Sequence, residues 1–180
     1  MTRIILVFGL ISSVILSILM FSTFPLMRSG AISYDNAAYV GFGGMIIGMV
    51  TIFFGVKSYR DNHLNGSITF GKAIGVGLLI ALVASIGYSI SWEFYFNLLE
   101  PDFMDKYAVM CIDKAKSTGA SEAEMKEVVA KTEQMQALYK IPVARFGITT
   151  TEPLPVGILW SLFSAAMLRK KSFLPATPTV

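Results

Sequence analysis

The stretch "AIGVGLLIALVASIGYSISW", Ala73 to Trp92, decides the fold, because it carries no charged side chain. A membrane-spanning helix needs about 20 such residues, at ~1.5 Å of rise each, to cross a hydrocarbon core about 30 Å thick. Its flanking residues are Lys72 and Glu93, so charge resumes where such a helix would leave the core. The stretch therefore predicts a spanning helix.

Three further uncharged runs repeat this pattern. They lie between Arg3 and Arg28, between Asp35 and Lys57, and between Glu152 and Arg169. We expect a single all-α membrane domain over 1–180, an integral membrane four-helix bundle with spans at about 4–27, 38–57, 72–97 and 146–168. A cleaved signal peptide is the alternative for the first run, but the run exceeds the roughly 7 to 15 apolar residues of a signal core and no small-residue cleavage site follows it.

The composition agrees with a membrane protein. Of the 180 residues 54% are hydrophobic and 15% are charged, whereas charged residues make up about 25% of an ordinary soluble domain. The net charge is +3, but the cations are scattered between apolar runs, which argues against nucleic-acid binding. The single cysteine, Cys111, excludes an internal disulfide and a cysteine-cluster metal site.

One charge-rich segment, 100–141, interrupts the apolar pattern and predicts an extramembrane helical hairpin between spans three and four. Gly119 suits a helix C-cap, and Ser121 with Glu124 forms a capping box for the second helix. Apolar residues at helical spacing give each helix one stripe, the first made of Phe103, Tyr107, Met110 and Cys111, and the second of Met125, Val128, Val129, Thr132, Met135, Leu138 and Tyr139. The stripes can pack on each other and on the lipid interface, or bind another protein.

Lysine and arginine favour one side of the predicted topology. The N-terminus, the loop after span two and the C-terminal tail carry one acid, Asp61, against Arg3, Lys57, Arg60, Lys72, Arg169, Lys170 and Lys171. By the positive-inside rule both termini are cytoplasmic and the 100–141 hairpin lies outside.

The loop "GSITFGKA", Gly66 to Ala73, resembles a nucleotide-binding P-loop but lacks its chemistry. Ala73 replaces the magnesium-binding hydroxyl, and no strand precedes the loop, so we expect no nucleotide. Asn65 and Gly66 instead suit a turn, and Ser67 or Thr69 can cap the next helix. Glycines of spans two and three should allow close helix contact, namely Gly44, Gly48, Gly71, Gly75 and Gly77. Lys57, Arg60 and Lys72 should lie at headgroup level and contact lipid phosphate.

Two carboxylates fall within the spans. Glu93 and Glu152 should reach similar depth near the outer interface, where they could form an ion or proton site. Alternatively each reaches the outer headgroups or pairs with Arg145. Pro153 and Pro155 should break or kink the start of span four. On the predicted cytoplasmic side, we expect Arg60, Asp61 and His63 to lie in a solvated turn after span two, with Arg60 paired to Asp61.

The sequence resembles a family of small bacterial four-span membrane proteins catalogued as a domain of unknown function. The resemblance extends from Arg3 to Lys171 and rests on "KSYRDNHLNGSITFGKA", "SWEFYFNL", "PDFMDKY" and "STGASEAE". It implies four spans in the inner membrane of a bacterium and brings no activity, substrate or catalytic residue.

We therefore expect a non-enzymatic accessory or interaction protein that acts through helix contacts and the outer hairpin. His63 and Cys111 fall on opposite sides, so no catalytic arrangement forms, and no cofactor or metal is expected. Its partners should be the lipid bilayer and a second copy or another membrane protein. The alternative is an oligomeric ion or proton transporter that uses Glu93 and Glu152.

Overall fold

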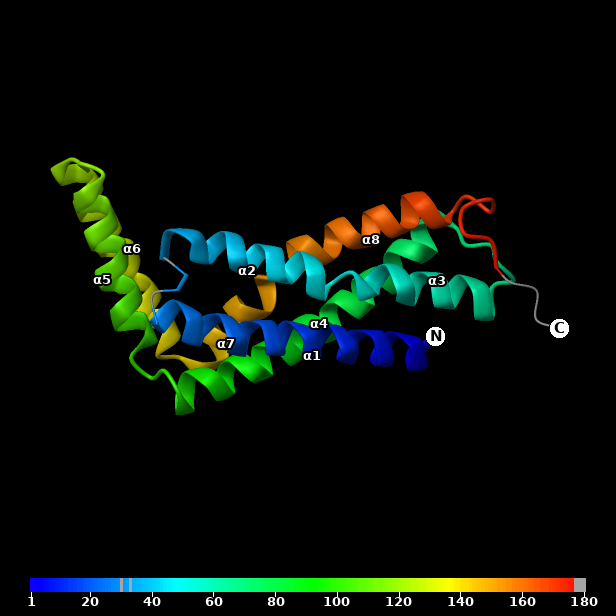
Figure 1. The fold of residues 1–180 in the computed structure, drawn as a ribbon, viewed down its shortest axis with the longest axis horizontal. Helices are drawn as coiled ribbons and strands as arrows, with labels where there is room; N and C mark the ends of the chain where they lie inside the picture. Colours follow the sequence, from blue (N-terminus) through cyan, green and yellow to red (C-terminus); the bar gives the residue numbers. More distant parts are fainter. Residues whose placement is uncertain (30, 33, 177–180) are drawn as a thin grey trace. The chain divides into compact units, whose positions relative to one another are not determined.

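The computed structural model describes residues 1–29, 31–32 and 34–176, and within these residues every regular element is an α-helix (Figure 1). The expected all-α class is therefore confirmed. The helices are α1 (Thr2–Arg28), α2 (Tyr34–Gly48), α3 (Thr51–His63), α4 (Phe70–Leu98), α5 (Phe103–Ser117), α6 (Glu122–Tyr139), α7 (Pro142–Thr151) and α8 (Leu154–Leu168).

Four helical segments of the described chain are long and apolar enough to cross a membrane. They are Thr2–Met27, Tyr39–His63, Phe70–Leu98 and Pro142–Leu168. Each overlaps one predicted span, and the chain is a membrane protein by this criterion. The second and fourth segments each consist of two helices, because α2 is separated from α3 and α7 from α8. The break before α8 lies at Pro153, as the sequence predicts.

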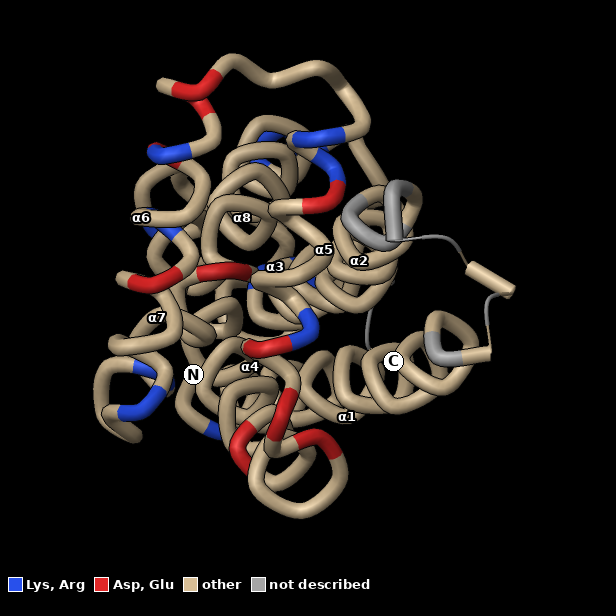
Figure 2. Tube along the Cα trace, turned by 90° about the vertical axis from the view of Figure 1, so that its left-hand side faces the viewer, with Lys and Arg blue, Asp and Glu red and all other residues tan. Residues whose placement is uncertain are grey.

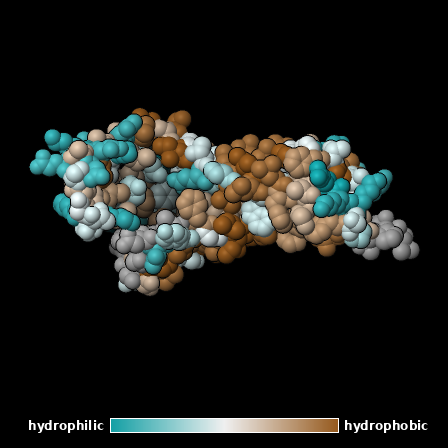
Figure 3. Space-filling view, turned by 90° about the horizontal axis from the view of Figure 1, so that it is seen from above, coloured by the Kyte–Doolittle hydropathy of each residue, from teal (hydrophilic) through white to brown (hydrophobic). Residues whose placement is uncertain are grey.

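The chain divides into two compact units, which we describe separately. The first contains Met1–Ser89 with Thr149–Val180, and the second contains Ile90–Ile148. In the first unit α1 packs against α2 and α3, and α3 packs against α8. The face of this unit that carries α8 is largely apolar: Figure 3 shows brown atoms over much of it, with teal atoms where α8 ends. On α1, the exposed residues Leu10, Val14 and Ile18 follow each other at four-residue spacing, as expected of a lipid-facing stripe.

Small residues bring α4 close to its neighbours within the first unit. A Cβ atom on Gly87 would lie 2.7 Å from Cβ of Ser13 in α1, and one on Gly77 would lie 2.8 Å from Cβ of Ser161 in α8. Neither position has room for a larger side chain. Association through small residues is a common way for helices to pack in lipid, where hydrophobic burial gives little driving force.

The glycine prediction is only partly correct. Gly48 and Gly77 do make close contacts, and Gly44 lies at ordinary distance from Leu19. The prediction of close helix contact was wrong for Gly71 and Gly75, because a Cβ atom there would meet nothing within 4 Å. Sequence spacing alone cannot tell which face of a helix meets a neighbour when apolar residues surround it on all sides.

In the second unit α5 and α6 run side by side as an antiparallel pair (Figure 1). The turn between them is built as predicted. Gly119 has φ +74°, and the amides of Ala120 and Gly119 donate to the carbonyls of Ala115 and Lys116, which completes a Schellman motif. On the other side of the turn Ser121 and Glu124 form the expected capping box.

The capping box also has a pH dependence. The Ser121 amide and hydroxyl both donate to the Glu124 carboxylate, and these hydrogen bonds hold the pKa of Glu124 below its ordinary value. Because this pKa is lowered on folding, the stabilising contribution is present above the ordinary value and is lost as the pH falls through the folded value. The box therefore remains formed at neutral pH.

The packed faces of the hairpin differ slightly from the predicted stripes. On α6 the predicted residues are indeed the less exposed ones, with Thr132 and Tyr139 buried. On α5 the buried residues are Met104, Ala108 and Ala115, and the predicted Tyr107 is exposed. The stripe is thus displaced by about one residue, because the small side chain of Ala108 permits closer approach than Tyr107 does.

We expect Gly77→Ala to destabilise the first unit by about 1 to 3 kcal/mol, since the new methyl group would overlap Ser161 and even approach its Cα at 3.1 Å. Gly75→Ala is the matched control, because it adds the same methyl group to an open position two residues away in the same helix. Thermal unfolding in detergent should show a loss for the first variant alone. Equal stability of the two variants would contradict this close packing.

Candidate functional site

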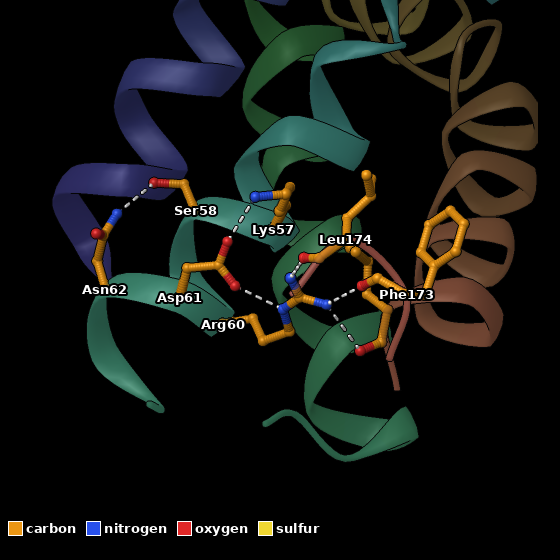
Figure 4. A network of polar contacts seen from close by, with 8 residues as sticks. Lys57, Ser58, Arg60, Asp61, Asn62, Phe173 and Leu174 are labelled. Atoms are coloured by element: carbon orange, nitrogen blue, oxygen red, sulfur yellow. Dashed lines mark hydrogen bonds and ion pairs between the residues drawn. The ribbon is translucent and has the colours of Figure 1, made fainter. Parts of the chain in front are cut away.

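Arg60 is completely buried near the end of α3, although a charged side chain rarely is. Its Nε donates to Asp61 at 2.6 Å, and Nη1 donates to the backbone carbonyls of Phe173 at 2.9 Å and Leu168 at 3.4 Å. Nη2 donates to the carbonyl of Leu174. Figure 4 shows the guanidinium enclosed by these acceptors. The planar fork of arginine suits this arrangement, since it presents several N–H groups in fixed directions.

The charge of Arg60 is balanced locally. Asp61 accepts from Arg60 and also from Lys57 Nζ at 2.6 Å, so one carboxylate serves two cations (Figure 4). Carbonyl dipoles from the end of α8 and from the following segment stabilise the remaining positive charge. We name this group of Lys57, Arg60, Asp61 and the carbonyls of Leu168, Phe173 and Leu174 the arginine clasp.

The clasp corrects two expectations. The predicted pairing of Arg60 with Asp61 is present, but these residues belong to a helix that extends to His63, and they do not form a solvated turn. Arg60 also donates inward and is fully buried, so it does not contact lipid phosphate in this structure. Lys57 is partly exposed and engaged with Asp61. The lipid contact of Lys72 stays a prediction.

The loop after α3 turns as the sequence indicates. Asn65 and Gly66 both have positive φ, at 51° and 77°, and the Gly66 amide donates to the Arg60 carbonyl. The next helix begins at Phe70, which puts Thr69 at its N-cap position. The loop therefore joins two helices, and Lys72 lies in the first turn of the second one.

Glu93 lies in the second unit and is held by a second buried arginine. Arg145 of α7 donates from Nε to one Glu93 oxygen at 2.8 Å and from Nη2 to the other at 2.5 Å. Its Nη1 donates to the carbonyl of Tyr139, and its guanidinium lies 4.2 Å from the centre of the Phe96 ring. This bidentate pair links α4 to α7. Of the alternatives for Glu93, the pairing with Arg145 is the one found.

Glu152 lies in the other compact unit, between α7 and α8. The predicted approach of Glu93 and Glu152 therefore stays a prediction. Within the described residues no group of three or more His, Cys, Asp or Glu side chains could hold a metal ion.

A feature that the sequence reasoning missed is the polar junction where α2 ends and α3 begins. The Ile52 amide bonds to the Met49 carbonyl, and the Val50 amide to that of Ile47, so both skip the carbonyl four residues earlier. The skipped carbonyl of Gly48 accepts from Ser12 of α1 at 2.7 Å. That of Ile46 accepts from the Trp160 indole of α8 at 3.0 Å.

The hydroxyl groups of Ser12 and Thr51 lie 2.5 Å apart at this junction. Side chains from two other helices thus donate hydrogen bonds to the carbonyls that the break leaves free, as the interior of a membrane protein requires. Gly43, Gly44 and Gly48 weaken the helix here. This group of glycines could have predicted the break, but not which helices donate hydrogen bonds to the carbonyls that it leaves free.

We expect Arg60→Gln to free the chain after α8, because glutamine cannot reach carbonyls on both sides of the loop. Trypsin should then cut after Lys170 or Lys171 about tenfold faster or more, given ~1.5 to 3 kcal/mol for a hydrogen bond to a charged group. Lys57→Gln is the control, since it removes a neighbouring cation and leaves the donors of Arg60 intact. An Arg60→Gln variant that is cut no faster than the wild type would show that the clasp does not hold this segment.

Comparison with known proteins supports the resemblance seen in the sequence. The family model described as "Protein of unknown function (DUF4199)" matches residues 7–170. A comparison with curated proteins and one with solved structures each give no significant match. Since the family match covers nearly the whole chain, including Arg60, Arg145 and the polar junction, the protein belongs to the DUF4199 family.

Proposed function

We propose that this protein is a non-enzymatic accessory or interaction protein of the bacterial inner membrane, which acts through helix contacts and through the α5–α6 hairpin. In this proposal both chain termini are cytoplasmic and the hairpin lies on the outer side. The observation that carries the proposal is the hairpin itself, a helix pair with its own turn, caps and packed face, which meets a buried arginine through the Tyr139 carbonyl at the end of α6.

The surface of the hairpin supports a binding role. Its two helices use one face each for mutual packing and expose the opposite faces, where lysine and acidic side chains alternate along α6. Figure 2 shows blue and red segments along α6, whereas α1 is almost entirely tan. Neither α5 nor α6 is among the segments that could span a membrane. A charged helix pair of this kind suits recognition of another protein chain in water.

Two carboxylates within the spanning segments support a non-catalytic role. Glu93 is engaged by Arg145, which joins α4 to α7, and Asp61 is engaged by Lys57 and Arg60 of its own helix, so both carboxylates are occupied by ion pairs. A catalytic or transport site would need such groups to face a substrate path.

The alternative is an ion or proton transporter based on Glu93 and Glu152. It is less well supported, because Glu93 would have to leave a bidentate partner that is itself buried. Proton or cation flux through the reconstituted protein, abolished by Glu152→Gln and retained in Glu152→Asp, would favour this alternative over our proposal.

The proposal can be tested by photo-crosslinking from the hairpin in living cells. A reactive residue at Val109, which is 59% exposed on α5, should give an adduct of one defined mass, either a dimer or a complex with one other protein. The same residue at Met104, which is buried, should give none, and at Val14 on α1 it should label lipid. Light scattering in a mild detergent should show the same assembly.

A purely monomeric protein in detergent, together with no protein adduct from Val109 or from Lys131 of α6, would overturn the proposal. Because Lys131 lies on the exposed face of the other hairpin helix, the two positions together sample both helices.

A further inference from the structure

The four residues after α8, 169–172, form a loop that the arginine clasp holds at both ends. Arg60 donates to the carbonyl of Leu168 on one side and to those of Phe173 and Leu174 on the other. The ring of Phe173 also packs against Phe53 of α3, with centroids 6.5 Å apart. The loop is therefore fixed in place by a buried side chain and is not a free terminal tail.

This basic loop presents three consecutive cations, Arg169, Lys170 and Lys171, all of them exposed. No ion pair to any of the three is found within the described residues. The acid of the clasp, Asp61, is already shared by Lys57 and Arg60. Within the described part of the chain the loop thus keeps an uncompensated positive charge, whereas in the hairpin Lys131 pairs with Glu127.

Contacts within the first unit extend the charged surface to the start of α4. The guanidinium of Arg169 lies 5.8 Å from the centre of the Phe70 ring, over the residue with which α4 begins. Lys72 follows in the same helical turn and is exposed. Four cations therefore belong to one end of this unit, on two segments that are in contact.

Exposed apolar side chains accompany these cations. Phe70, whose ring Arg169 contacts, is 40% exposed, and Leu174, two residues after the basic loop, is 47% exposed. A soluble anion would leave this apolar surface in water. A phospholipid would cover it with acyl chain while its phosphate meets the cations, as basic residues at a membrane interface commonly do.

We propose that the basic loop, 169–172, and Lys72 form a binding site for the phosphate group of anionic phospholipids. The inference does not depend on the proposed role of the hairpin. In this proposal residues further along the chain contact the lipid in place of Arg60. Arg60 has a different role, which is to position the loop through its hydrogen bonds to the carbonyls on both sides.

The test measures lipid binding to the purified full-length protein in a neutral detergent. Phosphatidylglycerol and phosphatidylcholine with identical acyl chains are added in equal amounts, and the retained lipid is counted by native mass spectrometry. The wild-type protein should prefer phosphatidylglycerol. In the triple variant Arg169→Gln, Lys170→Gln, Lys171→Gln the ratio of bound phosphatidylglycerol to bound phosphatidylcholine should fall. Each lost cation should reduce this ratio about fivefold, so the three together should reduce it roughly a hundredfold at most.

The matched control removes three exposed lysines from the hairpin, Lys126, Lys131 and Lys140, and should keep the preference. An equal loss in both triple variants would show a general charge effect and overturn the proposal. So would a wild-type protein without preference, or one that binds a short oligonucleotide as tightly as phosphatidylglycerol.

Arg60→Lys tests the positioning role separately, because it keeps the net charge but cannot donate to both ends of the loop. The variant should keep the helix content of the wild type, as measured by circular dichroism, yet prefer phosphatidylglycerol less. Should its preference equal that of the wild type while trypsin cuts the loop faster, Arg60 would have no part in the lipid site.

Discussion

Hydrocarbon offers no hydrogen-bonding partners, so every backbone carbonyl that a membrane helix fails to satisfy must find a donor elsewhere in the protein. The polar junction between α2 and α3 follows from this constraint. Two freed carbonyls, those of Ile46 and Gly48, accept from Trp160 and Ser12, which belong to two other helices. The break therefore ties α1 and α8 to the second span, and the packing of the first unit depends on it.

The arginine clasp applies the same principle to a charged group. Burying a guanidinium is costly unless its donors are satisfied and its charge is balanced. Arg60 meets both conditions through Asp61 and three backbone carbonyls. In the second unit Arg145 does the same with Glu93 and the Tyr139 carbonyl. Each arginine joins segments far apart in sequence, and both guanidinium groups donate to acceptors of the protein itself.

Much of the architecture was predictable from local patterns. The four uncharged runs predicted the spanning segments, the proline at 153 predicted the break before α8, and "STGASEAE" predicted the hairpin turn with both of its caps. The errors occurred where the partner decides the outcome. Gly71 and Gly75 have the same spacing as useful glycines, yet no helix approaches them, and Arg60 looked like an interfacial cation because the sequence does not show the chain that returns to cover it.

The sequence by itself determined which segments are helical and apolar enough to enter a membrane, since hydropathy, capping and turn chemistry act within a few residues. Only the tertiary structure decided which polar groups remain available for function. Glu93 and Arg60 are occupied, whereas Arg169, Lys170 and Lys171 are held in place and unpaired within the described chain. The reason is that the energy of a charge depends on what surrounds it in space, and the three carbonyls that accept from Arg60 are more than a hundred residues away along the chain.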